Sequence, residues 1–359
     1  MPKLRSLLAA LLVLPAVGCS SLGYYGQAIS GQFEVYRKSR PVAEVIADPA
    51  TDPRLRAKLA DVQRVREFAS RELGLPDNDS YRVYADLGRR YVLWNVFATP
   101  ELSLEPLTWC FPVSGCVAYR GYFSREAAEA YAEKLRAAGY DVHVGGVTAY
   151  STLGWFSDPL LNTMIHRPLP EIAGLLFHEL AHQRLYVRGD TAFSESFAMT
   201  VELEGVRRWL EANGEADEYA RYARTLERRQ QFTQLVLRYR DRLEALYAAE
   251  IGVEEKRAGK ARLFAQLRAE YEQLRTAWGG DGRYDGWFAR EINNAHIASV
   301  GTYHHHVPAF QALLARNEGD MRAFYRAVAE LGALPVLERS AALSAFLPTA
   351  TLAAEPEAR

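Results

Sequence analysis

Two histidines and a glutamate stand at a spacing that can hold a metal ion, in the segment His178-Glu179-Leu180-Ala181-His182. On a helix, residues four positions apart share a face, so His178 and His182 can bind one zinc ion while Glu179 lies beside it. An apolar run without proline precedes them at 172–177, which favours a buried helix. The alternative interpretation is a buried helix with two structural histidines.

A catalytic zinc site needs a third protein ligand and an open fourth position. A third histidine six residues beyond His182 is excluded, because Arg188 stands there. Instead, Gly189-Asp190 supplies a turn and an N-cap for a second helix. Folding the two helices antiparallel about this turn brings Glu195 opposite His182. The sequence therefore predicts one Zn²⁺ per chain, held by His178, His182 and Glu195.

The charge balance excludes one class of partner. The 359-residue chain carries 43 basic and 44 acidic side chains, so it has no excess of positive charge to hold a phosphate backbone. Nucleic acid is therefore not an expected partner. A peptide is the substrate that the zinc motif favours.

The N-terminus is typical of an export signal over residues 1–18. Lys3 and Arg5 precede an apolar run at 7–14 that is too short to span a bilayer comfortably. An exported protein enters an oxidising compartment, in which pairs of cysteines can form disulfides.

The segment Ala16-Val17-Gly18-Cys19 resembles a bacterial lipobox. This resemblance predicts cleavage before Cys19, acylation of its thiol and attachment to a membrane through the lipid. Ser20, in place of aspartate, favours the outer membrane, so the expected location is the periplasmic face of that membrane in a bacterial cell envelope. An ordinary signal with a coincidental cysteine, or a short anchor, is the alternative.

Cys110 and Cys116 are the cysteines that remain. Their short separation predicts a disulfide that closes a local loop, contributing roughly 2 kcal/mol by loop-closure entropy. Metal binding by the pair is the alternative, but the chain has no second pair to complete four ligands.

We expect an α+β fold that is predominantly helical and has a small antiparallel sheet. Residues 19–165 are predicted to form N-terminal helices and a β-rich subdomain, with helix breaks at Arg40-Pro41 and Asp52-Pro53. Strands are predicted at 81–85, 91–97, 117–122 and 140–144, and a helix capped by Ser124 is predicted through Leu135.

Residues 166–351 are predicted to form a helical subdomain that carries the zinc site. Apolar stripes at 232–246 and 263–274 predict a long helical hairpin, an arm over about 216–278. The tail at 352–359 is expected to be disordered.

A donor for the oxyanion that forms during hydrolysis is also needed, and Tyr303 is the candidate. The alternative is a structural role for this tyrosine. The neighbouring His304, His305 and His306 are rejected as a second metal site, because adjacent residues on a helix point about 100° apart.

Several of these segments together resemble a bacterial family of zinc aminopeptidases with a gluzincin, or thermolysin-like, catalytic core. The resemblance rests on 178–183, on Phe193-Ser194-Glu195-Ser196-Phe197-Ala198, on the loop from Cys110 through 123, on 149–155 and on 293–303. It implies a glutamate ligand at Glu195, and a substrate-binding edge strand at 147–155. Two features depart from the gluzincin pattern. The connection between His182 and Glu195 is short, and Met199 replaces an aspartate that orients a histidine, with Glu202 as a substitute one turn later.

The sequence thus favours zinc-dependent peptide hydrolysis with Glu179 as the general base. The name aminopeptidase comes from the resemblance, since no carboxylate is spaced to mark a site for a substrate α-amine. The alternative is a non-catalytic envelope lipoprotein, stabilised by zinc, that acts as a binding or scaffold protein.

Overall fold

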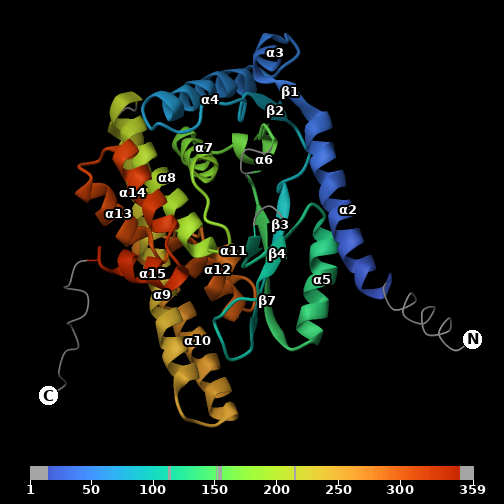
Figure 1. Ribbon diagram of the computed structural model, residues 1–359, viewed down its shortest axis with the longest axis vertical. Coiled ribbons are helices and arrows are strands. Elements are labelled where there is room, and N and C mark those ends of the chain that lie inside the picture. The colour runs from blue at the N-terminus through green and yellow to red at the C-terminus, as the bar shows by residue number, and fades with distance from the viewer. Residues whose placement is uncertain (1–14, 112–114, 151, 153–155, 214–215, 348–359) are drawn as a thin grey trace, which may run out of the picture.

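The computed structural model describes residues 15–111, 115–150, 152, 156–213 and 216–347 (Figure 1). The expected tail at 352–359 and residues 1–14 of the expected export signal lie outside this range.

Within the described residues, the N-terminal half contains short strands and four helices longer than a single turn. They are α2 (Pro15–Lys38), β1 (Ser39–Pro41), α3 (Val42–Ala47), α4 (Pro53–Arg71), β2 (Val83–Ala85), β3 (Leu93–Pro100), β4 (Trp109–Phe111), β5 (Gly115–Val117), β6 (Arg120–Tyr122), α5 (Arg125–Ala137), β7 (Tyr140–Val147), β8 (Leu160–Leu161) and the one-turn α6 (Asn162–Ile165).

The C-terminal half is helical in the part that the structure describes. Its elements are α7 (Leu169–Arg184), α8 (Thr191–Asn213), α9 (Ala216–Ala248), α10 (Val253–Ala277), α11 (Asp285–Phe288), α12 (Asn294–His304), α13 (Val307–Arg316), α14 (Met321–Gly332) and α15 (Val336–Ser344). The predicted helical arm is confirmed as the antiparallel pair α9 and α10, which projects from the body in Figure 1.

An antiparallel sheet with the strand order β6-β3-β7 stands beside the helical half. One face packs on α5, where Val96 and Val144 meet Ala128 and Ala132 in a small core. The opposite face meets α12. Ser124 caps α5 as predicted, because its hydroxyl accepts a hydrogen bond from the backbone nitrogen of Ala127.

Two sequence expectations for the strands need correction. The predicted strand at 117–122 is interrupted, because β5 ends at Val117 and pairs with β4 whereas β6 pairs with β3. Within the described residues the expected small antiparallel sheet is three small sheets, and one of them also contains a parallel pair, β2 with β8. The β2–β8 pairing joins segments about 75 residues apart, which local sequence patterns do not report.

Helices α7 and α8 form the centre of the largest core, together with α4, α13 and α14. Two glycines let α7 and α8 approach closely. A Cβ on Gly205 would lie 2.5 Å from Cδ2 of Phe177, and one on Gly174 would lie 3.1 Å from Cγ of Glu202. The turn between the helices has Gly189 at φ 80°, and Asp190 caps α8 by accepting a hydrogen bond from the backbone nitrogen of Phe193. The predicted helix–turn–helix arrangement is therefore present.

No helix within the described residues is long and apolar enough to cross a bilayer.

Candidate metal centre

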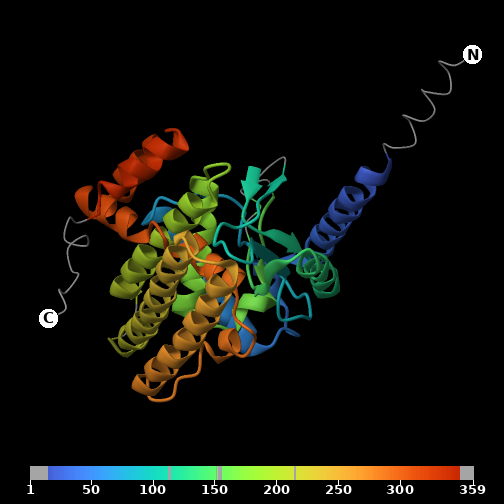
Figure 2. The same ribbon diagram turned by 90° about the horizontal axis from the view of Figure 1, so that it is seen from below.

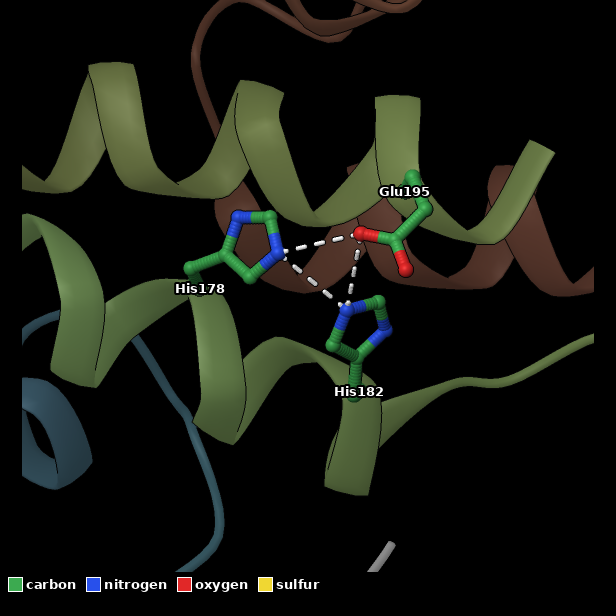
Figure 3. A group of neighbouring side chains, drawn as sticks. All are labelled: His178, His182 and Glu195. Carbon is green, nitrogen blue, oxygen red and sulfur yellow. Dashed lines mark hydrogen bonds and ion pairs between the residues drawn. The ribbon is translucent and has the colours of Figure 1, made fainter. Parts of the chain in front are cut away.

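The side chains of His178, His182 and Glu195 converge between α7 and α8 (Figure 3). Oε2 of Glu195 lies 3.2 Å from Nε2 of His178 and 3.4 Å from Nε2 of His182. The two Nε2 atoms are 3.2 Å apart. All three residues are buried. The predicted turn has thus brought the carboxylate onto the face that the two imidazoles share.

These separations fit a tetrahedral zinc ion. Zinc binds nitrogen and oxygen at about 2.0–2.2 Å, which places neighbouring ligand atoms of a tetrahedron roughly 3.3–3.5 Å apart. The donor set of two neutral imidazoles and one carboxylate is also a known catalytic set, and it leaves a fourth position free. The group could therefore hold a metal ion, and zinc suits its chemistry.

A chain of polar contacts continues from His178 away from the centre. Its Nδ1 lies 3.3 Å from Oε2 of Glu202 on α8, and Oε1 of Glu202 accepts a hydrogen bond of 2.8 Å from Nη1 of Arg229 on α9. Ligand histidines are commonly oriented by a carboxylate on the second ring nitrogen. Glu202 stands where the sequence suggested a substitute, and the helical arm supplies its partner.

The carboxylates of this cluster stay ionised. Burial raises the pKa of Glu195, but the neighbouring His182 and His178 lower it further, to about 2. Burial also raises the pKa of Glu202, and Arg229 and His178 outweigh it, again giving about 2. Burial lowers the pKa of His178, whereas its contacts with Glu195 and Glu202 raise it well above the usual value, so metal binding at this ring would displace a proton.

Glu179 has the opposite tendency. Burial raises its pKa, and the two histidines beside it offset this only in part. A carboxyl group with a raised pKa is suited to accept and return a proton near neutral pH. Glu179 points into the same cleft as the three candidate ligands.

A cleft of about 660 Å³ opens over this centre. Its walls come from α2, from the sheet, from the β4–β5 hairpin and from α7, α8 and α9. Residues from these walls include Gln32, Asn95, Phe111, Tyr119, Val147, Tyr150, Leu175, Tyr186, Met199 and Arg229. Within the described lining, the acidic side chains are Glu179, Glu195 and Glu202.

Two tyrosines of the cleft were missed by the sequence reasoning. Tyr119 follows β5, and burial together with the nearby Glu195 raises its pKa well above the usual value. Tyr186 lies just beyond α7, with its ring 6.1 Å from that of His182. Neither tyrosine had a local signal in the sequence, because Tyr119 lies between β5 and β6 and α7 ends at Arg184, two residues before Tyr186.

The predicted oxyanion donor Tyr303 falls on α12, and its side chain and that of His304 lie outside the described residues. His296, in the first turn of the same helix, is buried away from the described cleft lining and packs on His143 at a ring distance of 4.1 Å. His306 contributes its backbone nitrogen to a hydrogen bond with Oγ of Ser196.

The predicted disulfide between Cys110 and Cys116 is present and joins β4 to β5. The hairpin lies against the turn between α7 and α8, because a Cβ on Gly115 would be 3.1 Å from the backbone nitrogen of Gly189. Of the segment expected to be a substrate strand, Val147 ends β7, residues 148–150 are not a strand, and 151 and 153–155 lie outside the described residues.

A family model described as Putative aminopeptidase matches residues 23–343. The chain belongs to this family. The match covers both the N-terminal helices and the candidate metal centre. The family indicates a peptidase and therefore peptide substrates. No match was found among curated proteins or among solved structures.

Proposed function

We propose that the protein is a zinc-dependent aminopeptidase. The observation that carries this proposal is the spacing of 3.2–3.4 Å among the donor atoms of His178, His182 and Glu195, inside a cleft that also contains Glu179. This arrangement supports the gluzincin-type core that the sequence suggested.

His178, His182 and Glu195 would hold the zinc ion, which would supply Lewis-acid chemistry by activating a water and polarising a peptide carbonyl. The carboxylate of Glu179 accepts a proton from the attacking water. It then delivers that proton to the leaving nitrogen as the C–N bond breaks. Tyr119 and Tyr186 line the cleft and, with Tyr303, are our candidates for donating a hydrogen bond to the oxyanion.

We propose that the peptide substrate binds along the edge of the sheet. β7 is an edge strand in the order β6-β3-β7, and its end at Gly146 and Val147 lines the cleft. An extended peptide can add to such an edge through backbone hydrogen bonds. Farther from the cleft the same edge is occupied, because Asn293 and Arg290 donate hydrogen bonds to the carbonyls of Val142 and Val144.

The catalytic proposal is tested by turnover of a peptide library, with free and with blocked N-termini, in the presence and absence of a chelator. Free N-termini should be preferred, and chelation should abolish turnover. Turnover that survives removal of the metal would refute zinc dependence.

Two variants separate the roles within the site. Glu195→Ala should lose zinc, whereas Glu179→Gln should keep near-stoichiometric zinc and lose activity by about 10² or more. Glu171→Gln is the matched control, because Glu171 lies on the same helix and its half-buried side chain pairs with Arg167. This variant should change neither zinc content nor activity. Substantial activity in Glu179→Gln would contradict the role of the base.

We further propose that Cys19 is acylated and anchors the chain to the periplasmic face of the outer membrane. The lipobox-like sequence supports this. Mass spectrometry of the mature N-terminus should show cleavage before Cys19 and a lipid on its thiol, and Cys19→Ser should abolish this processing. An unmodified Cys19 in the wild-type chain would refute the anchor.

A further inference from the structure

Helix α2 has two faces of different character. On one face Val35 is 1% exposed, and Gly31 packs so closely on Phe123 that it leaves no room for a Cβ. Polar contacts also join this face to the body of the protein. Gln27 accepts a hydrogen bond from the backbone nitrogen of Phe123, and Glu34 pairs with Arg89 at 2.8 Å. The helix is therefore held in a fixed orientation on the body.

The other face carries an exposed aromatic and aliphatic stripe, formed by Tyr25, Ile29, Phe33 and Tyr36. These residues are 41%, 71%, 63% and 75% exposed, respectively. They recur every three or four positions and so lie along one line of the helix. A soluble surface rarely leaves such a line of large apolar side chains in water without a partner.

Helix α2 also forms one wall of the cleft. Tyr24, Ala28 and Gln32 line it, and Gln32 accepts a hydrogen bond of 2.7 Å from the hydroxyl of Tyr150. Gln32 lies three residues after Ile29 and four before Tyr36, and Ala28 lies three after Tyr25, so on the helix the stripe borders the cleft wall. Whatever covers the stripe must therefore lie next to the cleft.

The position of the stripe on the chain favours a membrane as its partner. Helix α2 begins at Pro15 and includes Cys19, the proposed lipid attachment point, six residues before Tyr25. Figures 1 and 2 show α2 along one edge of the molecule, with its N-terminal end pointing away from the body. An acyl chain at Cys19 would hold this edge at a bilayer surface.

The chemistry of the stripe agrees with that location. Tyrosines stand at both ends, Tyr25 and Tyr36, with Ile29 and Phe33 between them. Tyrosine prefers the headgroup level, and apolar side chains of an interfacial helix enter the boundary with the acyl chains. Arg37, next to the stripe, is exposed and can contact anionic headgroups.

We propose that the exposed stripe of α2 lies in the membrane interface and orients the catalytic cleft beside the bilayer. The choice of a membrane as the partner of the stripe rests on the proposed lipid anchor at Cys19. The effect on substrates rests on the proposed catalytic role of the cleft. It adds a second attachment to the lipid, which matters because stable attachment usually needs two signals. The substrates that reach the cleft would then be peptides close to the membrane surface.

The experiment uses the full-length chain, purified in detergent and reconstituted on vesicles of phosphatidylethanolamine and phosphatidylglycerol at 3:1. A single cysteine is introduced by Ile29→Cys or Phe33→Cys and labelled with an environment-sensitive dye. Leu337→Cys is the matched control, since Leu337 is also a highly exposed apolar residue, at 85%, but on α15. Brominated lipids then quench any dye that reaches the acyl region.

We expect quenching at positions 29 and 33 at least about twofold greater than at position 337. Equal quenching at all three positions would overturn the proposal. A dye at position 29 that becomes shielded without vesicles, in proportion to protein concentration, would instead indicate a second copy of the chain and would also overturn it.

Mass spectrometry of the same sample separates this result from the anchor. Acylated Cys19 with no quenching at position 29 refutes the docking of α2 and leaves the anchor intact. Quenching at position 29 with unmodified Cys19 supports the docking and refutes the anchor. Hydrolysis of a soluble peptide by Ile29→Ser/Phe33→Ser should equal that of the wild type, because neither side chain lines the cleft over the metal centre.

Discussion

Glu202 is expected to govern both zinc affinity and the attachment of the helical arm. It contacts Nδ1 of His178 at 3.3 Å and accepts a hydrogen bond from Arg229 at 2.8 Å, and it is 8% exposed. Glu202→Met keeps the side-chain length beside Gly174 but removes both polar contacts. His178 then loses the group that orients its ring.

The magnitudes follow from the burial of the two partners. Loss of an outer carboxylate typically lowers metal affinity by about 10- to 100-fold. Breaking a buried ion pair costs about 3–5 kcal/mol, but the Arg229 side chain is 31% exposed and can recover part of its hydration. We therefore expect the free energy of unfolding of Glu202→Met to fall by about 2–3 kcal/mol.

The assay combines zinc titration against a chromophoric chelator with urea unfolding of the zinc-free protein. Glu204→Gln is the control, since Glu204 lies on the same helix and pairs with Arg207 and Arg208 away from the metal centre. It should leave zinc affinity unchanged.

A double variant divides the two effects. Glu202→Met/Arg229→Met removes both charges and should recover much of the lost stability while zinc affinity stays low. Wild-type zinc affinity in Glu202→Met would refute the orienting role. Wild-type stability would refute the energetic link to the arm.

Three further outcomes are expected. If the Tyr303 phenol is the oxyanion donor, Tyr303→Phe should lower kcat by about 10² with little change in KM, zinc content or Tm. A near-wild-type kcat would instead assign the role to Tyr119 or Tyr186. Burial lowers the pKa of His143 to about 4, so between about pH 6.5 and pH 4 this histidine takes up a proton in the unfolded chain but not in the folded one. The free energy of unfolding should therefore fall by up to about 3 kcal/mol as the pH is lowered toward 4. His143→Phe should reduce this loss, as measured by urea unfolding at pH 7 and 4.5. Gly205→Ala should destabilise the fold by about 1–3 kcal/mol, because the added Cβ overpacks against Phe177. Gly26→Ala should stabilise it by about 0.5–1 kcal/mol, because no described atom lies within 4 Å of its added Cβ. Equal urea midpoints of unfolding for the two variants would contradict this reasoning.

The features that the sequence predicted well are local ones. Helical spacing places His178 and His182 on one face of α7, and the turn at Gly189-Asp190 needs only a left-handed glycine and an N-cap. Because the connection is so short, these local rules also brought Glu195 to the two histidines. The arm followed from its apolar stripes in the same way.

The tertiary structure decided what lies around that centre. Arg229 lies 27 positions along the chain from Glu202, and Tyr119, between β5 and β6, lines the cleft with His178 although it lies about 60 residues earlier in the chain. The stripe on α2 was invisible as an exposed surface, because only packing shows which face of an amphipathic helix is covered. Spacing along one helix determines which side chains share a face, whereas contacts between distant segments depend on how whole elements pack, and the sequence pattern of one segment carries no record of its partner.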